Sequence, residues 1–196
     1  MKGLNNPIGI KSLEPSQSPF IMNPSRYASS GRDATRGVIA GGWGGSALTV
    51  MDYVTIATTS GTTTFGDMIT ASYSRGGAVS DAGRGVFGGG YDVSAATNAV
   101  EYITVATASD ATAWGATLSS ARYYVGAVSS GTRGVWGGGS GSSNLIDYIT
   151  IATTGTVTTF GATLLTGRPT YGAVDNRSRG VFGGAGTLDY ITIATT

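Results

Sequence analysis

The sequence predicts an all-β protein, and within that class a small β-propeller of four repeated units. Arg-Gly-Val recurs four times at intervals of 48, 49 and 46 residues. Each of the first three units holds four short segments rich in β-branched and aromatic residues, and the last holds three. No apolar stripe with a helical period is visible, and Gly and Thr are poor helix formers. Repeats of roughly 40–50 residues with four strands each are typical of β-propellers. The recurring arginines are Arg36, Arg84, Arg133 and Arg179.

The third unit shows the expected strands most clearly. The Gly-containing turn 130–132 joins its first two segments, as in a β-hairpin. In its third segment Ile149 and Ile151 face one way, while Tyr148 and small residues face the other. Because both faces are apolar or small, we expect each sheet to lie between two neighbouring sheets. The expected strands are 123–129, 133–139, 146–154 and 157–164, and the four blades span about 26–70, 75–118, 122–164 and 168–196.

The fourth unit contains no counterpart of the fourth segment, which in the other units holds Phe-Gly or Trp-Gly. Just before the first unit, residues 18–22 resemble a shortened copy of that segment. We expect them to pair with the last strand and close the ring within residues 18–196; pairing with a neighbouring copy is the alternative. An unpaired edge this rich in β-branched residues would favour aggregation. The residues expected to close the ring are Phe20, Ile21, Tyr190, Ile191 and Ile193.

The composition argues against several classes of function. Cys and His are both absent, so thiol nucleophiles, thiolate metal sites and histidine bases are excluded. Charged residues make up 12% of the chain and the net charge is +1, without the basic stripe of a nucleic-acid-binding protein. The sequence has neither a signal-peptide-like start nor an apolar run of about 20 residues. We therefore expect no cofactor, no nucleic-acid partner and no membrane partner.

Acidic side chains recur once per unit, directly before a tyrosine. Paired carboxylates could cleave glycosides, and a propeller carrying an arginine cluster could act as a sialidase-type hydrolase. The acids share one repeat position, however, and most arginines share two, which indicates structural ion pairs or hydrogen bonds to carbonyl groups. The glycine runs are followed neither by Lys nor by a helix start, unlike phosphate-binding loops. We predict no catalytic residue, no metal site and no enzyme activity. The recurring acids are Asp52, Glu101, Asp147 and Asp189.

One loop varies in length between the units. From the glycine doublet to the acidic residue the separation is 10, 12, 9 and 5 residues. Binding residues are often carried by variable loops on a rigid scaffold, and exposed aromatic side chains suit sugar or protein contacts. The candidate partner-binding residues are therefore Trp43, Tyr91 and Asp92; loop variation without function is the alternative.

The N-terminal segment 1–17 differs in composition from the repeats. It is polar, contains two prolines and holds both lysines of the chain. We interpret it as an extended arm that orders when it binds another protein, with plain disorder as the alternative. The candidate anchor residues are Lys2, Ile8, Ile10 and Lys11.

The repeat resembles the kelch repeat over residues 26–196. The kelch pattern combines a strand ending in two glycines, a tyrosine, an aromatic residue after a spacer, and an arginine before the next unit. The matching residues are Gly183 and Gly184, Tyr148, Trp114 or Phe160, and Arg122 or Arg168. The resemblance implies a kelch-like propeller of four blades, although kelch propellers usually have six or seven and carry Trp where this chain mostly has Phe.

The same repeats also resemble short kelch-like proteins of tailed phages, especially those of marine and cyanobacterial hosts. That resemblance implies a non-enzymatic virion protein, assembled in the host cytoplasm. We expect it to decorate the capsid surface, with the arm as anchor, and the major capsid protein as partner. The alternative is a tail-borne or surface adhesin that binds host glycans or a receptor through the loops 43–51, 90–100 and 139–146. Self-association into a homo-oligomer is compatible with either role.

Overall fold

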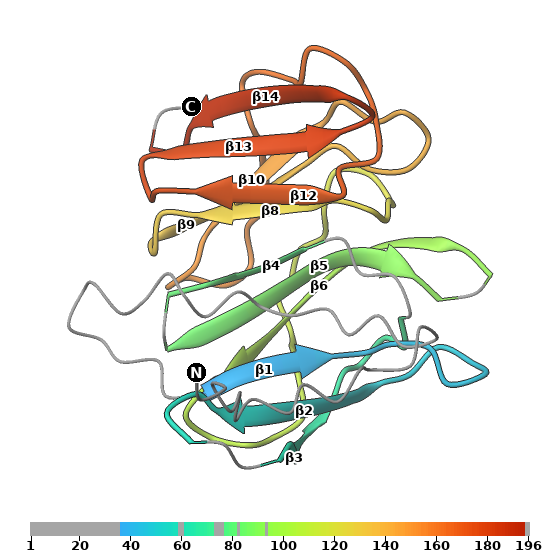
Figure 1. The fold of residues 1–196 in the computed structure, drawn as a ribbon, viewed down its shortest axis with the longest axis vertical. Coiled ribbons are helices and arrows are strands. Elements are labelled where there is room, and N and C mark those ends of the chain that lie inside the picture. Colours follow the sequence, from blue (N-terminus) through green and yellow to red (C-terminus); the bar gives the residue numbers. More distant parts are fainter. Residues whose placement is uncertain (1–35, 59–60, 73–76, 82, 93, 195–196) are drawn as a thin grey trace, which may run out of the picture.

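The computed structural model describes residues 36–58, 61–72, 77–81, 83–92 and 94–194. Over these ranges the chain is all-β, with fourteen strands and no helix, as expected (Figure 1). Consequently the described chain has no helix that could cross a membrane. The predicted arm 1–17 and the predicted closing segment 18–22 lie outside these ranges.

The strands form four separate antiparallel sheets, one for each repeat. In every sheet the strands follow one another in chain order, so each is a simple meander. The first sheet contains β1 (Arg36–Ala40), β2 (Val50–Thr55) and β3 (Thr63–Asp67). The second contains β4 (Gly77–Ser80), β5 (Arg84–Tyr91), β6 (Ala96–Thr104) and β7 (Thr112–Ala113). The third contains β8 (Gly126–Ser129), β9 (Arg133–Gly137), β10 (Ile146–Thr150) and β11 (Thr158–Thr159). The fourth contains β12 (Gly172–Asp175), β13 (Arg179–Gly184) and β14 (Thr187–Thr192).

The pairing register is the same in all four sheets. The valine of Arg-Gly-Val always lies opposite the tyrosine that follows the acidic residue. These pairs are Val38 with Tyr53, Val86 with Tyr102, Val135 with Tyr148, and Val181 with Tyr190. The repeat seen in the sequence is therefore a repeat of structure.

Several strands are shorter than the sequence predicts. The third strand of the third unit stops at Thr150, because the Thr153 amide turns back to donate to the Thr150 carbonyl at 3.1 Å. The fourth strand is reduced to β11. Beyond it, Phe160 and Leu164 donate their amides to the carbonyls of Ile146 and Asn144, outside the regular ladder. The segment thus follows the edge of the sheet by isolated hydrogen bonds.

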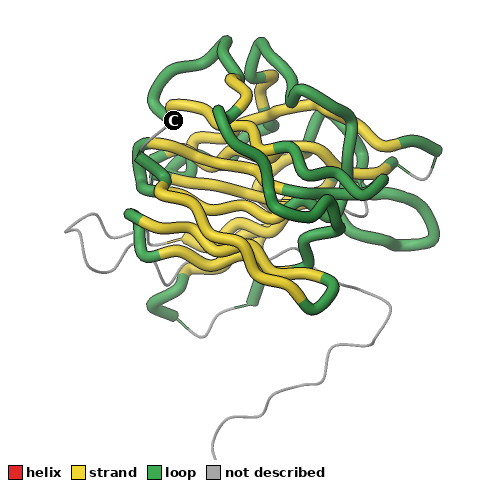
Figure 2. Tube along the Cα trace, turned by 90° about the horizontal axis from the view of Figure 1, so that it is seen from above, coloured by secondary structure: helices red, strands yellow, loops and turns green. Residues whose placement is uncertain are grey.

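Successive sheets pack face to face through three hydrophobic clusters. One cluster joins the first and second sheets around Met51 and Phe87, and the next joins the second and third around Trp114 and Trp136. The last joins the third and fourth around Phe160 and Phe182. Strand β8 lies beside both β4 and β12, so the first strands of the second, third and fourth sheets approach one another closely. Seen from above, the loops gather beyond the ends of the strands (Figure 2).

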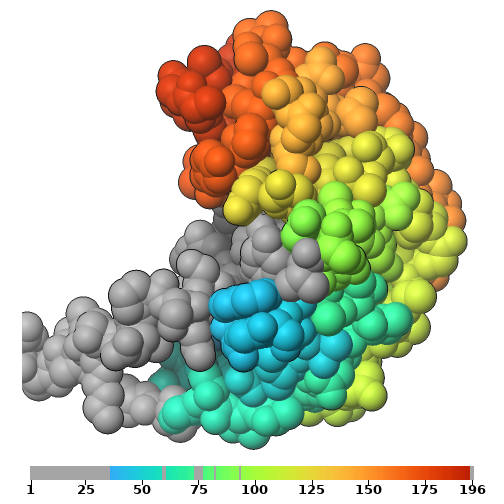
Figure 3. Space-filling view, turned by 90° about the vertical axis from the view of Figure 1, so that its right-hand side faces the viewer, coloured from blue at the N-terminus to red at the C-terminus, as the bar shows by residue number. Residues whose placement is uncertain are grey.

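The sheets follow one another along an arc from the first to the fourth (Figure 3). This arrangement is compatible with a β-propeller, in which sheets are arranged around an axis. Among the described residues no hydrophobic cluster joins the fourth sheet to the first. Of the residues predicted to close the ring, Ile191 and Ile193 are buried against the third sheet and Tyr190 is exposed. Closure of the ring stays a prediction.

Candidate functional site

A row of four tyrosines crosses from the second sheet to the fourth, and we call it the tyrosine row. Its members are Tyr91, Tyr123, Tyr124 and Tyr171. The ring centroids of successive members lie 4.9, 4.7 and 5.4 Å apart, with tilted planes. Tyr91 ends β5, whereas the other three lie in the segments that lead into β8 and β12. Because β4, β8 and β12 lie on the inside of the arc, the tyrosine row lies at one end of this inner surface.

Backbone hydrogen bonds fix the segment that carries the middle of the row. The Ser140 amide donates to the Tyr123 carbonyl at 2.7 Å, and the Thr170 amide donates to the Tyr124 carbonyl at 2.8 Å. Tyr124 has a φ of 55°, which is uncommon for a bulky residue and is held here by these bonds. The adjoining Val125 is fully buried in the hydrophobic cluster between the second and third sheets and so anchors the segment. The rings are therefore presented on a rigid support.

The tyrosine row offers aromatic faces and hydroxyl groups to solvent. Tyr124 is 40% exposed and Tyr171 is 70% exposed, so ligands can reach the third- and fourth-sheet end of the row. Tyrosine combines a large apolar ring with a hydrogen-bonding hydroxyl and is favoured at binding surfaces. The row has the chemistry of a surface that binds sugar rings or protein side chains.

The three candidates from the variable loops lie in different surroundings. Tyr91 is the first member of the tyrosine row. Trp43, 42% exposed, lies in the loop between β1 and β2 and pairs with Ala47 in an isolated bridge. Asp92 accepts hydrogen bonds from the amides of Ser94 and Ala95 and from the Ser94 hydroxyl, at 2.7–2.9 Å. These bonds, that from Ala95 foremost, lower the pKa of Asp92 and fix its own turn.

Tyr123, Tyr124 and Tyr171 are candidates that the sequence did not reveal. The available signal was the presence of aromatic residues one to three positions before Gly-Ala-Val in the third and fourth units. Sequence spacing does not show that the linkers of different units meet, so the contact between these rings could not be predicted from it.

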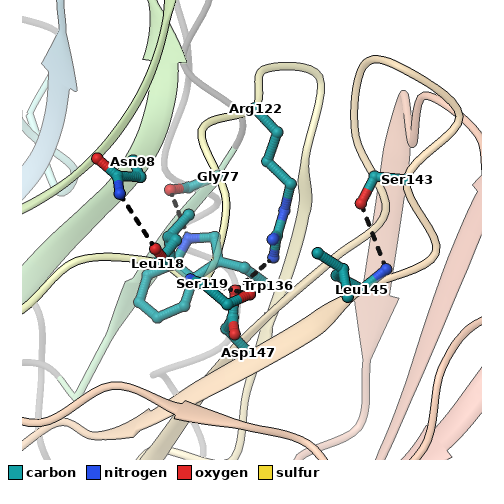
Figure 4. Close-up of polar contacts among 9 residues, drawn as sticks. All are labelled: Gly77, Asn98, Leu118, Ser119, Arg122, Trp136, Ser143, Leu145 and Asp147. Carbon is teal, nitrogen blue, oxygen red and sulfur yellow. Dashed lines mark hydrogen bonds and ion pairs between the residues drawn. The ribbon is translucent and has the colours of Figure 1, made fainter.

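Three of the four recurring acids, Glu101, Asp147 and Asp189, hold segments that connect successive sheets. Glu101 accepts hydrogen bonds from the amides of Ile69 and Thr70, both at 3.0 Å. Asp147 accepts from the amide and hydroxyl of Ser119 at 3.2 and 2.9 Å and pairs with Arg122 at 2.7 Å (Figure 4). In each case an acid of one sheet fixes the segment that enters that sheet.

The fourth sheet repeats this arrangement with an ion pair. Arg168 Nη2 and Asp189 Oδ2 lie 2.7 Å apart, and both side chains are buried. In the third sheet burial lowers the pKa of Arg122, while the charge of Asp147 and the hydrogen bond to it oppose that shift. Glu101, Asp147 and Asp189 and these two arginines thus serve the structure, as their repeat positions indicated.

The Arg-Gly-Val arginines connect each sheet to the next. Arg84 donates to the Ile151 carbonyl at 2.8 Å, and Arg133 donates to the Ile193 carbonyl at 3.0 Å. Arg36 donates in the same way to Ala106 at 2.8 Å. Each guanidinium also lies over the tyrosine of its own sheet, 4.4–4.7 Å from the ring centroid. The arginines of the first three sheets thus each donate a hydrogen bond to the sheet that follows in the chain.

Comparison with known proteins finds no family and no curated protein that matches this chain. Within the described residues no group of three or more acidic side chains is placed to hold a metal ion.

Proposed function

We propose that the chain is a non-enzymatic structural protein of a tailed-phage virion, built as a kelch-like propeller that decorates the capsid surface. The proposal that the protein is not an enzyme rests on one observation: the recurring acids and arginines make structural contacts within and between the sheets. Glu101, Asp147 and Asp189 are buried and are occupied by backbone amides or arginines. The assignment to a virion is supported by the resemblance of the repeats. The low share of charged residues, 12%, also suits a protein packed into an assembly.

A binding experiment with phage heads tests this proposal. Labelled full-length protein and a variant lacking residues 1–17 are added to purified heads and, separately, to host cells. We expect saturable binding to heads that is lost when the arm, with Lys2, Ile8, Ile10 and Lys11, is removed. Binding to cells alone would contradict the capsid role, and equal binding of both forms to heads would contradict the arm as anchor.

The tyrosine row favours an adhesin as the second candidate function. In this alternative the row and the neighbouring variable loops bind host glycans, because aromatic faces stack on sugar rings. Replacing both Tyr124 and Tyr171 by Ala should abolish binding to a glycan array. Leu165→Ala is the matched control, since Leu165 is 92% exposed and lies outside the row. Glycan binding that survives the double substitution would exclude the row as the binding site.

We further propose that residues 18–22 supply the missing fourth strand of the fourth sheet. In the described chain β14 pairs with β13 along one edge only. A strand added beside it would cover the other edge and give this sheet the four strands of the second and third. Deletion of residues 1–25 should lower the melting temperature or cause aggregation. An unchanged melting temperature in a non-aggregating protein would refute this role.

A further inference from the structure

The contacts between neighbouring sheets repeat, and each uses the same two kinds of surface. We call the side of a sheet that touches the next sheet in the chain its trailing face, and the opposite side its leading face. The trailing faces of the second and third sheets present valines from their first two strands: Val79 and Val86, and Val128 and Val135. The leading faces of the third and fourth sheets present an aromatic ring and isoleucines: Trp136, Ile149 and Ile151, and Phe182, Ile191 and Ile193.

Glycines make the trailing face fit the aromatic ring of the next sheet. A Cβ atom placed on Gly88 would lie 2.9 Å from the ring of Trp136, and one on Gly137 would lie 2.9 Å from Phe182. The Trp136 indole also donates to the Gly77 carbonyl at 3.0 Å (Figure 4). The arginine-to-carbonyl hydrogen bond described above adds a polar contact, so the junctions between the second, third and fourth sheets each combine an apolar centre, a glycine slot and one such hydrogen bond.

The fourth sheet carries the same trailing face, but no described sheet covers it. Val174 is 60% exposed, whereas its counterparts Val79 and Val128 are 3% and 1% exposed. Tyr190 is 67% exposed, and no atom would lie within 4 Å of a Cβ on Gly172. The surface that is buried in two earlier sheets is here open to solvent.

The trailing face of the fourth sheet also carries the arginine that donates to the next sheet in the earlier junctions. Arg179 lies over its own Tyr190 at 4.8 Å, as the other three arginines lie over theirs. In the described chain the Arg179 guanidinium is exposed and no following sheet provides a carbonyl group.

The first sheet offers the matching leading face. Ile39 occupies the position of Trp136 and Phe182, and Val54 occupies that of Ile149 and Ile191. Ile56 is 44% exposed, whereas the equivalent residues Val105, Ile151 and Ile193 are between 0% and 6% exposed. The two ends of the arc are therefore complementary halves of the junction that the chain already makes between its second, third and fourth sheets.

We propose that two copies of the chain join head to tail, with the fourth sheet of each packed on the first sheet of the other. Arg179 then donates to the carbonyl of Ile56 of the partner subunit, and the glycines of β12 and β13 receive Ile39 of the partner subunit. A two-fold axis makes the two junctions identical, so the arcs close into one ring without free faces. A second copy is favoured because the two ends of one arc lie apart (Figure 3) and share no hydrophobic cluster.

The mass of the full chain in solution tests this assembly, measured by size-exclusion chromatography with light scattering. We expect twice the 19.7 kDa of one chain. Val174→Asp on the trailing face and Ile56→Asp on the leading face should each raise the dissociation constant by roughly 100-fold or more, since each buries an unpaired charge. Leu165→Asp, at an exposed position outside both faces, should leave the mass unchanged. A cooperative melting transition of each monomeric variant shows that the chain still folds, as expected because both replaced side chains are exposed in the single chain.

Mixing the two face variants distinguishes a head-to-tail junction from a face that binds itself. Each variant keeps the surface that the other lacks, so the mixture should recover a dimer through one intact junction. A monomeric wild-type chain would overturn the proposal, as would particles larger than two chains. Loss of the dimer in Val174→Asp but not in Ile56→Asp would also overturn it, because the fourth sheet would then bind its own copy. None of these readouts depends on phage heads or glycans.

Discussion

At the scale of single residues, buried charged side chains hold the structure together in pairs. Burying either charge without its partner would destabilise the fold. Arg122 and Asp147 are 1% and 0% exposed and lie 2.7 Å apart. Removing one member of such a pair leaves the other charge buried without compensation. The pair also ties the segment 119–122 to β10, so it fixes the entry of the chain into the third sheet.

Replacing Arg122 by Leu should therefore cost about 3–5 kcal/mol of the free energy of unfolding, because Asp147 stays buried without its counter-ion. Ser119→Ala removes only hydroxyl hydrogen bonding to the same carboxylate and should cost about 1 kcal/mol. Urea unfolding of both variants and the wild type measures the difference. Equal costs for the two substitutions would show that the ion pair contributes little to stability.

The structural use of these residues was predictable from the sequence, but their partners were not. Asp147 and Arg122 each recur at a fixed repeat position, which is the behaviour of a structural residue. Glu101 shows the limit: it accepts hydrogen bonds from the backbone amides of Ile69 and Thr70. Nearly every residue has a backbone amide, so the sequence does not show which amides donate to a carboxylate. The spacing of charged residues could therefore not reveal this arrangement.

At the scale of sheets, small residues decide how closely neighbours approach. Gly88 lies under the Trp136 ring, whereas its counterpart position on the open face has no neighbouring sheet. The alternation of valines and glycines along β4 and β5 thus forms a surface shaped for one aromatic residue. Packing at this density leaves no room for an added methyl group.

Gly88→Ala should accordingly destabilise the chain by about 1–3 kcal/mol, because the Trp136 ring has to move. Gly172→Ala, where a Cβ would meet no atom, should stay within about 0.5 kcal/mol in the monomer. Thermal unfolding at low protein concentration compares the two. A larger loss for Gly172→Ala than for Gly88→Ala would contradict the packing described for these faces.

The sequence predicted the type and order of the strands better than their ends. The β-branched run 146–154 was expected to be one strand, yet β10 ends at Thr150 where a turn begins. Local propensity is uniform along that run, so only the turn hydrogen bond sets the boundary. The tyrosine row escaped prediction for a related reason: Tyr91, Tyr124 and Tyr171 come together through the packing of three sheets.

At the scale of the whole molecule, the four described sheets make three junctions, and the outer faces of the first and fourth sheets meet no described sheet. The sequence shows the number of repeats, but it does not specify whether the ends meet within one chain or between two. Val174 and Ile56 are as apolar as their buried counterparts, and in the described structure both are exposed, as is Tyr190. Apolar faces of this kind are typical of surfaces that associate.

A disulfide engineered across the proposed junction tests this central claim most directly, because the chain contains no Cys. A Cβ on Gly134 would lie 2.9 Å from the Val79 Cβ, and one on Gly180 would lie 3.1 Å from the Val128 Cβ. The equivalent pair across the open ends is Val174 and Gly37, and a small shift reaches the roughly 3.5–4.5 Å that a disulfide needs.

The variant carrying both Val174→Cys and Gly37→Cys is oxidised, and its mass is measured under denaturing conditions without reductant. The account predicts a covalent dimer of twice 19.7 kDa, while each single-cysteine variant stays at the mass of one chain. A disulfide formed within one chain, or a covalent dimer of the Val174→Cys variant alone, would contradict it.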